Sequence, residues 1–507
     1  MFNQVKIGAI LSYVSIFITL VIGFIYTPIL LNMLGKSEYG LYSLAATLLA
    51  YLNILDMGLG NTIIRYLSEN RVTGDKEKES IYNGFFLILY IIIGLMTLLI
   101  GIVINSYIDD LFSNTLTLEE LDKFHSMVLI IVVSLACSFP LSVFTSIINA
   151  YEKFMYIKTI NIVQTILNPL IAIPFLIAGY GSIMVITISC LLNILGLIFN
   201  LYYCITKLHI KFLFRKLKIK LVKEMLVYSF FIFLNYIMDK VYWNSGQFIL
   251  GIISGTVYVA IYALAMQFMN VYIKLSIALS GVLLPKITMM VSEENINTNR
   301  LSMLMIKIGR LQYIIVAYIL FMFIILGKEF LFLWVGNEYY EVYPIVIILM
   351  LGMFVPLIQN TGILILQALN LNKYRMTVYT CIAIIDFLVS FPMAKYFDGI
   401  GCAITTALAL FISAGLIINR YYYKKINLNI LLFWKNIVKM TIPLIALSMI
   451  IFIIKANIII IVSWKSFIIE SSLLTLLYLF TMNRYAFNEY ERSLLVNTFN
   501  IVRKIKI

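Results

Sequence analysis

Ionisable side chains inside long apolar runs are the residues of this 507-residue sequence with the greatest potential for chemistry. A charge at the centre of a membrane helix costs at least about 2.5 kcal/mol on insertion scales, so such a residue usually faces a polar cavity or a partner. Seven such residues lie inside these runs: Asp56, Asp239, Lys240, Lys274, Arg310, Asp386 and Glu470. If the runs are membrane spans, these charges predict a polar interior.

The seventh apolar run is the richest in polar residues. Tyr236, Lys240, Trp243 and Gln247 follow one another at intervals of four and three residues, and Asp239 adjoins them. Residues three and four apart share one face of a helix. Aromatic rings stack on sugars and polar tips bond hydroxyls, so this face predicts a sugar-lined cavity. A purely structural interaction between the adjacent acid and lysine is the alternative.

Cations facing water inside a membrane suit an anionic cargo, such as a pyrophosphate or an acidic sugar. For Arg65 and Arg310, near span ends, snorkelling of the long side chain to the headgroups is the alternative. The predicted substrate-binding residues are Arg65, Lys240, Trp243, Gln247, Lys274 and Arg310.

Three carboxylates could carry a coupling proton or sodium ion. They are Asp56, in the segment LDMGLGN, Asp239 and Asp386. Structural hydrogen bonding is the alternative for Asp56 and Asp386, and the interaction with Lys240 is the alternative for Asp239.

Signatures of catalysis are missing from the sequence. It has no P-loop, no G-x-S-x-G motif and no metal-binding cluster, its five cysteines form no C-x-x-C pair, and its only histidines are His125 and His209. We therefore expect neither an enzyme nor a bound cofactor or metal. The net charge of +14 is typical of cytoplasmic loops in a membrane protein, so we expect no nucleic-acid partner.

Composition places the chain in a membrane. Hydrophobic residues make up 62% of it, charged residues only 12%, and the mean hydropathy is +0.99. A bilayer needs roughly 20 apolar helical residues per span, which predicts an all-α integral membrane protein of about fourteen helices. The predicted spans are 9–33, 40–64, 81–105, 125–149, 157–178, 181–205, 226–250, 256–282, 303–326, 343–369, 374–395, 399–421, 437–455 and 466–483.

The distribution of Lys and Arg predicts the orientation. With the N-terminus in the cytoplasm, 29 of the 38 basic residues fall on the inner side, 6 on the outer side and 3 inside spans. This bias fits the positive-inside rule, and both termini are predicted to be cytoplasmic, in a bacterial inner membrane. The first apolar run is too long for a signal peptide and is predicted to be retained.

A basic segment divides the predicted spans into two groups. Residues 1–206 are predicted to form a six-helix lobe, 207–224 a basic amphipathic linker on the anionic phospholipids of the cytoplasmic face, and 225–425 a second six-helix lobe. Residues 426–507 add two helices and a tail. Equal, even numbers of spans predict a parallel repeat with a pseudo-two-fold axis along the membrane normal.

Several segments resemble polysaccharide transporters, the Wzx-like O-antigen and capsule flippases of the multidrug/oligosaccharidyl-lipid/polysaccharide (MOP) exporter superfamily. They are 28–42 (PILLNMLGKSEYGLY), 55–66 (LDMGLGNTIIRY), Asp239-Lys240 with Gly251 and Gly255, 260–265 (AIYALA), 332–339 (FLWVGNEY) and 398–403 (DGIGCA). The resemblance covers nearly the whole chain in the expected order.

This resemblance implies a MATE-like fold of two lobes around a hydrophilic cavity. It also implies that the chain flips undecaprenyl-pyrophosphate-linked repeat units for O-antigen, capsule or exopolysaccharide, with a polysaccharide polymerase and a chain-length regulator as partners. The last two helices would help to hold the lipid tail. A peptidoglycan-precursor flippase and a cation-coupled drug antiporter of the same fold are the close alternatives, and a membrane glycan polymerase or ligase is a more distant one.

Overall fold

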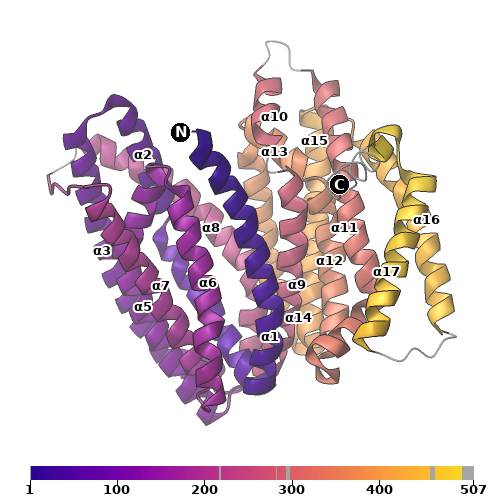
Figure 1. Cartoon of the computed structure of the whole chain (residues 1–507), viewed down its shortest axis with the longest axis horizontal. Coiled ribbons are helices and arrows are strands. Elements are labelled where there is room, and N and C mark those ends of the chain that lie inside the picture. Colours follow the sequence, from indigo (N-terminus) through magenta and orange to yellow (C-terminus); the bar gives the residue numbers. More distant parts are fainter. Residues whose placement is uncertain (1, 216–218, 281–282, 293–296, 457–462, 494–507) are drawn as a thin grey trace, which may run out of the picture. The chain divides into compact units, whose positions relative to one another are not determined.

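The computed structural model describes residues 2–215, 219–280, 283–292, 297–456 and 463–493. Nearly all of these residues are helical and none lies in a strand, which confirms the predicted all-α class (Figure 1). The first half contains α1 (Phe2–Leu52), a 3-10 turn (Asn53–Asp56), α2 (Leu59–Thr73), α3 (Lys76–Ser106), α4 (Ile108–Phe112), α5 (Leu118–Ala150), α6 (Phe154–Ile177), α7 (Ser182–Thr206) and α8 (Ile219–Ile253).

The second half continues with further helices and two short π-helical segments. They are α9 (Thr256–Ser280), α10 (Leu284–Val291), α11 (Thr298–Val335), a 3-10 turn (Asn337–Tyr339), α12 (Val342–Ile358), α13 (Asn360–Ala368), α14 (Asn372–Leu410), a π-helical segment (Phe411–Ile418), α15 (Asn419–Lys425), α16 (Ile430–Ala456), α17 (Trp464–Thr481) and a second π-helical segment (Met482–Ala486).

The described helices account for the predicted number of spans. Eleven stretches are long and apolar enough to cross a membrane, and α12 with α13, bent by 43°, makes a twelfth. Two of the eleven run for 63 and 54 residues, far beyond the roughly 20 that one span needs. Each is broken by non-helical backbone, at Gly35 (φ 76°) and at Asp398 (φ 47°). Dividing both there gives fourteen spans.

The chain divides into two compact units. Unit 1 comprises Met1–Ala263 and Ala394–Gly399. Within it α5 packs against both α3 and α7, and α1 packs against α6. A Cβ atom at Gly94 would lie 2.6 Å from the carbonyl oxygen of Ala136, so the missing side chain lets α3 and α5 approach closely.

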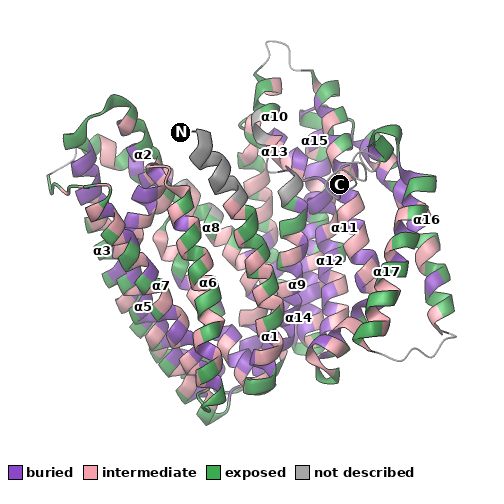
Figure 2. Cartoon of the chain, viewed as in Figure 1, coloured by how far each residue is buried: buried purple, intermediate pink, exposed green. Residues whose placement is uncertain are grey.

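Unit 2 comprises Leu264–Met393 and Ile400–Ile507. The 38-residue α11 packs against α12 and α16, and it also contacts α17. Most of α12 is buried, whereas α16 and α17 carry exposed residues along their length (Figure 2). In a membrane, those exposed apolar side chains face acyl chains.

The basic linker is held by unit 1. The backbone N–H of Leu213 donates to the carbonyl of Ser80 at 2.9 Å, and Arg215 pairs with Glu77 in the first turn of α3. Residues 209–215 are irregular and α8 begins at Ile219. The boundary between the two units falls inside α9, so α8 belongs to unit 1. The predicted repeat of six spans and six spans follows from the order of the spans along the chain. It stays a prediction.

Candidate functional site

Polar side chains of α8 follow one another at helical spacing, as the sequence predicts. We call Tyr236, Asp239, Lys240, Trp243 and Gln247 the α8 polar face. The Asn61 amide donates to the Tyr236 hydroxyl at 3.1 Å, and the Thr47 hydroxyl donates to the side-chain oxygen of Gln247. These partners lie on α2 and α1, so the α8 polar face is anchored within unit 1 near both of its ends.

The middle of the α8 polar face combines a carboxylate, a cation and an indole ring. The Asp239 carboxylate interacts with Lys240 and with the Trp243 side chain. Trp243 also meets Tyr242 in an edge-to-face contact, with ring centroids 5.5 Å apart. Asp239 is exposed, while Lys240 and Trp243 are half-buried. The group therefore offers a stacking surface together with both signs of charge, which suits a sugar that carries a phosphate.

Arg65 lies beside an earlier turn of α8. Its guanidinium carbon is 4.5 Å from the centroid of the Tyr228 ring, and its Nε is 3.1 Å from Glu69, one turn further along α2. The Arg65 side chain is 48% exposed, so a bound anion could still reach it. The structure thus places Arg65 against α8, the helix that carries the α8 polar face. The pairing with Glu69 follows the four-residue spacing that sequence reasoning overlooked.

Asp56 ends a 3-10 turn where the second span is interrupted. Met57 and Gly58 have positive φ values of 52° and 71°, and the Ser229 hydroxyl donates to the Met57 carbonyl at 2.5 Å. The Tyr90 hydroxyl donates to the Asp56 carboxylate at 2.6 Å. Interrupted backbone at membrane depth is tolerated where it is buried in protein or lines a cavity. The carboxylate therefore has a defined hydrogen-bond partner at an irregular point of the span.

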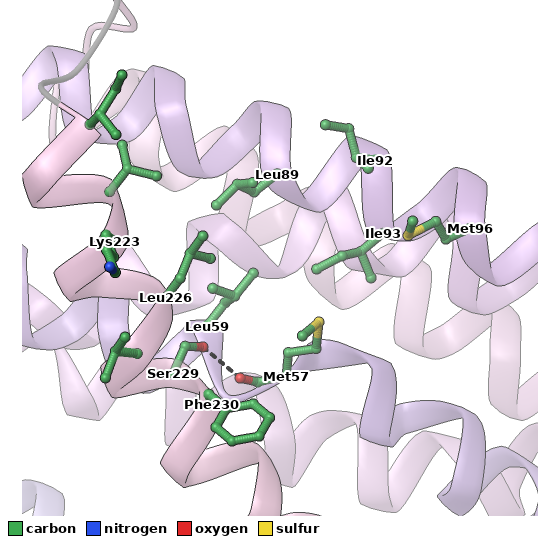
Figure 3. Close-up of a pocket in the computed structure, with 13 residues that line it drawn as sticks. Met57, Leu59, Leu89, Ile92, Ile93, Met96, Lys223, Leu226, Ser229 and Phe230 are labelled. Carbon is green, nitrogen blue, oxygen red and sulfur yellow. Dashed lines mark hydrogen bonds between the residues drawn. The ribbon is translucent and has the colours of Figure 1, made fainter.

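An apolar pocket of about 790 Å³ opens next to this interruption (Figure 3). Its walls come from the start of α2, the middle of α3 and the first turns of α8, with Lys223 among otherwise largely hydrocarbon side chains. Met57, Leu59, Leu89, Ile92, Ile93, Met96, Ile219, Val222, Lys223, Leu226, Val227, Ser229 and Phe230 line it. These walls suit a hydrocarbon chain, and sequence reasoning gave no sign of the pocket because its residues come from three separate helices.

Lys274 and Arg310, the predicted cations of unit 2, have opposite environments. Lys274 is exposed on α9. Arg310, on α11, is only 4% exposed and donates to both carboxylate oxygens of Glu491, at 2.6 and 2.7 Å. It donates further to the Ala486 carbonyl at 2.8 Å and to the Asn436 side chain at 3.3 Å. Most of the donors of Arg310 are therefore already used within the protein, while the ammonium of Lys274 is accessible.

Asp386 lies among hydroxyl groups in unit 2. It is 3% exposed, and it accepts from Thr406 at 3.3 Å and from Ser390 at 3.4 Å. The Ser390 hydroxyl is also 2.6 Å from that of Thr405. An all-oxygen set of one carboxylate and hydroxyls suits a proton or a hard cation. Within the described residues, no group of three or more His, Cys, Asp and Glu side chains could hold a metal ion.

A second ion cluster in unit 2 also escaped sequence reasoning. The Lys455 ammonium lies 2.8 Å from Glu329 and 3.2 Å from Glu470. These residues belong to α16, α11 and α17. Together with Arg310 and Glu491, the cluster ties the last two spans to α11 at two separated positions along that helix. No local spacing predicts such pairs, because their members are far apart in the sequence.

A bundle of many long apolar helices in two units, with charged groups at span depth in each, defines a multi-pass membrane protein. Its fold is that of the MOP superfamily. A lipid II flippase, MurJ, in an inward closed conformation matches 96% of this chain and 100% of its own, with a TM-score of 0.75 at 17% identity. An inward-facing multidrug resistance MATE family transporter of the MOP superfamily matches 80% of this chain and 96% of its own, with a TM-score of 0.61 at 13% identity.

A comparison of sequences assigns the chain to a family. The family model described as polysaccharide biosynthesis protein matches residues 5–291, more than half of the chain, and the chain belongs to this family. No curated protein matches the sequence. The predicted resemblance to polysaccharide transporters of the MOP superfamily is confirmed, as is the predicted fold class.

Proposed function

We propose that this protein flips undecaprenyl-pyrophosphate-linked oligosaccharide repeat units across the bacterial cytoplasmic membrane by alternating access. The product would feed surface polysaccharide synthesis, with a polymerase and a chain-length regulator acting after it. Both termini would lie in the cytoplasm, and no covalent chemistry would occur on the protein. An ion gradient acting through Asp386, Asp239 or Asp56 would supply energy for uphill transport.

The observation that carries this proposal is the α8 polar face in a member of the polysaccharide biosynthesis family. Lys240 and Trp243 are half-buried at span depth beside the exposed Asp239. A cation and an indole so placed can bind the phosphate and the sugar of one lipid-linked molecule. The apolar pocket beside Lys223 would accept part of the isoprenoid chain, since its walls are largely hydrocarbon.

A peptidoglycan-precursor flippase is the second candidate. Its support is the TM-score of 0.75 to the lipid II flippase over nearly the whole chain. Both cargoes join a sugar to a lipid through phosphate groups, so the same cations would serve either of them. A drug antiporter has less support, because the similarity to the multidrug transporter covers less of the chain.

The test is transport by the full-length protein in proteoliposomes that contain either a lipid-linked oligosaccharide or lipid II. Arrival of the sugar at the far leaflet is read with a membrane-impermeant reagent. We expect oligosaccharide transport by the wild type and its loss in Lys240→Ala. Lys395→Ala, which removes an exposed lysine outside the α8 polar face, is the matched control.

Two outcomes would overturn the proposal. Transport of lipid II without transport of the oligosaccharide would assign the chain to the second candidate. Equal oligosaccharide transport by Lys240→Ala and the wild type would remove the α8 polar face from the site. Melting temperatures of both variants show whether a loss of transport reflects a loss of folding.

A further inference from the structure

Residues 209–215, the part of the basic linker that we call the strap, lie along one end of unit 1 between α7 and α8. Exposure alternates along the strap: Ile210 and Phe212 are half-buried, whereas Lys211 and Leu213 are exposed. An alternation of period two is typical of extended backbone that rests with one side on a surface. The strap therefore lies on the helices of unit 1 as a defined segment.

Two contacts fix the first part of the strap to α7 and α5. The backbone N–H of Ile210 donates to the carbonyl of Cys204, on α7, at 3.3 Å. The rings of Phe212 and of Phe144, on α5, meet edge to face with their centroids 5.9 Å apart. Because α5 packs against both α7 and α3, the strap crosses helices that are already held together.

The helix α3 holds the next part of the strap through its backbone. The Asn83 side-chain amide donates to the Lys211 carbonyl at 3.3 Å, and the Leu213 N–H donates to the Ser80 carbonyl at 2.9 Å. A Cβ atom at Gly84 would lie only 2.5 Å from the Leu213 carbonyl oxygen. A backbone atom cannot move aside as the end of a side chain can. Glycine at position 84 therefore lets the strap lie directly on α3.

The start of α8 is separated from α3 by the apolar pocket. The helix α8 packs against α1 and α2, and the pocket of about 790 Å³ lies between its first turns and the middle of α3 (Figure 3). Further along α8, the Ser229 hydroxyl donates to the Met57 carbonyl. The helix begins at Ile219, four residues after Arg215, so its start lies within about 15 Å of the end of the strap.

We propose that the strap is a tether that sets the width of the apolar pocket, by keeping the start of α8 close to α3. Its anchor at Gly84 is five residues before Leu89, the first α3 residue of the pocket wall. The wall on α8 begins at Ile219, the first residue of that helix. The strap thus connects the two walls at the end of the pocket where α3 and α8 both begin. Only the identity of the ligand, an isoprenoid chain, rests on the proposed function.

The experiment compares two insertions of four residues, Gly-Ser-Gly-Ser, in the full-length protein. One follows Arg215 and lengthens the tether by up to about 14 Å. The matched control precedes His209, so it lengthens the chain only before the strap. Spin labels at Ile88→Cys on α3 and Ile219→Cys on α8, both exposed positions, report the distance across the pocket by double electron–electron resonance. The native cysteines are replaced by alanine.

We expect the insertion after Arg215 to lengthen and broaden the distance distribution, and the insertion before His209 to leave it as in the wild type. Gly84→Ala, whose added Cβ atom displaces the Leu213 carbonyl, should broaden the distribution too. Equal distributions for the two insertions would overturn the tether, as would an unchanged distribution in Gly84→Ala. Melting temperatures show that each variant is folded before its distances are compared.

Transport by the same two insertion variants tests the link to the cargo. Transport of the lipid-linked oligosaccharide should be slower with the insertion after Arg215 than with the insertion before His209. The distances are measured without any cargo, so they test the tether even if the wild type carries no oligosaccharide. Equal transport rates together with a lengthened distance would support the tether and would count against the placement of the isoprenoid chain in this pocket.

Discussion

Arg310 and Glu491, 181 residues apart in the sequence, form a two-point ion pair with nitrogen–oxygen distances of 2.6 and 2.7 Å. Their side chains are only 5% and 2% exposed. Two parallel charge-assisted hydrogen bonds fix direction as well as distance. The pair therefore attaches the segment that follows α17 to α11.

Glu491→Gln should strongly destabilise the protein. Removal of one partner of a buried ion pair leaves an uncompensated charge, at a cost of about 3–5 kcal/mol. The double variant Arg310→Met/Glu491→Leu should recover most of the loss, because it removes both charges. Thermal melts of the purified variants in detergent measure both effects. A single variant that melts like the wild type would show that the pair contributes little.

Lys274→Ala should impair transport while leaving folding intact, since the Lys274 side chain is exposed. Loss of a hydrogen bond to a charged group, worth about 1.5–3 kcal/mol, should lower the apparent affinity for an anionic cargo roughly ten- to hundredfold. Glycan export in cells and lipid flipping in vesicles measure the effect. Lys439→Ala, another exposed lysine of unit 2, is the control. Wild-type transport by Lys274→Ala would exclude this lysine from the site.

Asp386→Asn should abolish the response of transport to an imposed ion gradient if this carboxylate carries the coupling ion. The amide keeps the size of the side chain but not its negative charge. Thr406→Val, which removes one hydroxyl donor to Asp386, should weaken the response without abolishing it. Transport rates in vesicles with and without a sodium or proton gradient supply the measurement. A normal gradient response in the asparagine variant would leave Asp386 with a structural role.

Leu226→Trp should slow transport by filling the apolar pocket beside Lys223, where the isoprenoid chain is proposed to lie. Leu95→Trp adds the same bulk to α3 at a position that is 58% exposed and does not line the pocket, so it should transport normally. The ratio of the two flipping rates isolates the effect of the pocket. Equal rates would indicate that the chain of the cargo lies elsewhere.

Hydropathy was sufficient to predict the fold class, and helical spacing was sufficient to predict that the residues of the α8 polar face follow one another along one helix. Both depend on residues close together in the sequence, so a period or a run length reveals them. The breaks at Gly35 and Asp398 fall between predicted spans because a polar or glycine-containing turn separates two apolar runs there. Residues 40–64, predicted as one continuous span, instead contain the interruption at Met57 and Gly58.

Long-range partners could not be predicted from the same signals. Nothing near Arg310 in the sequence indicates Glu491, and Thr47 is 200 residues away from Gln247. The predicted substrate residues are divided between unit 1 and unit 2, so their joint action on a cargo stays a prediction. The apolar pocket also requires several helices to be placed in space before its lining residues can be identified.

The attachments of α11 constrain how the last two spans can move. Arg310 fastens the segment after α17 to one part of α11, and Lys455 joins α16 and α17 to Glu329 further along the same helix. A rod fixed at two separated points cannot swing about either of them. If the protein changes conformation during the proposed transport, we therefore expect α16 and α17 to move together with α11 rather than about a hinge of their own.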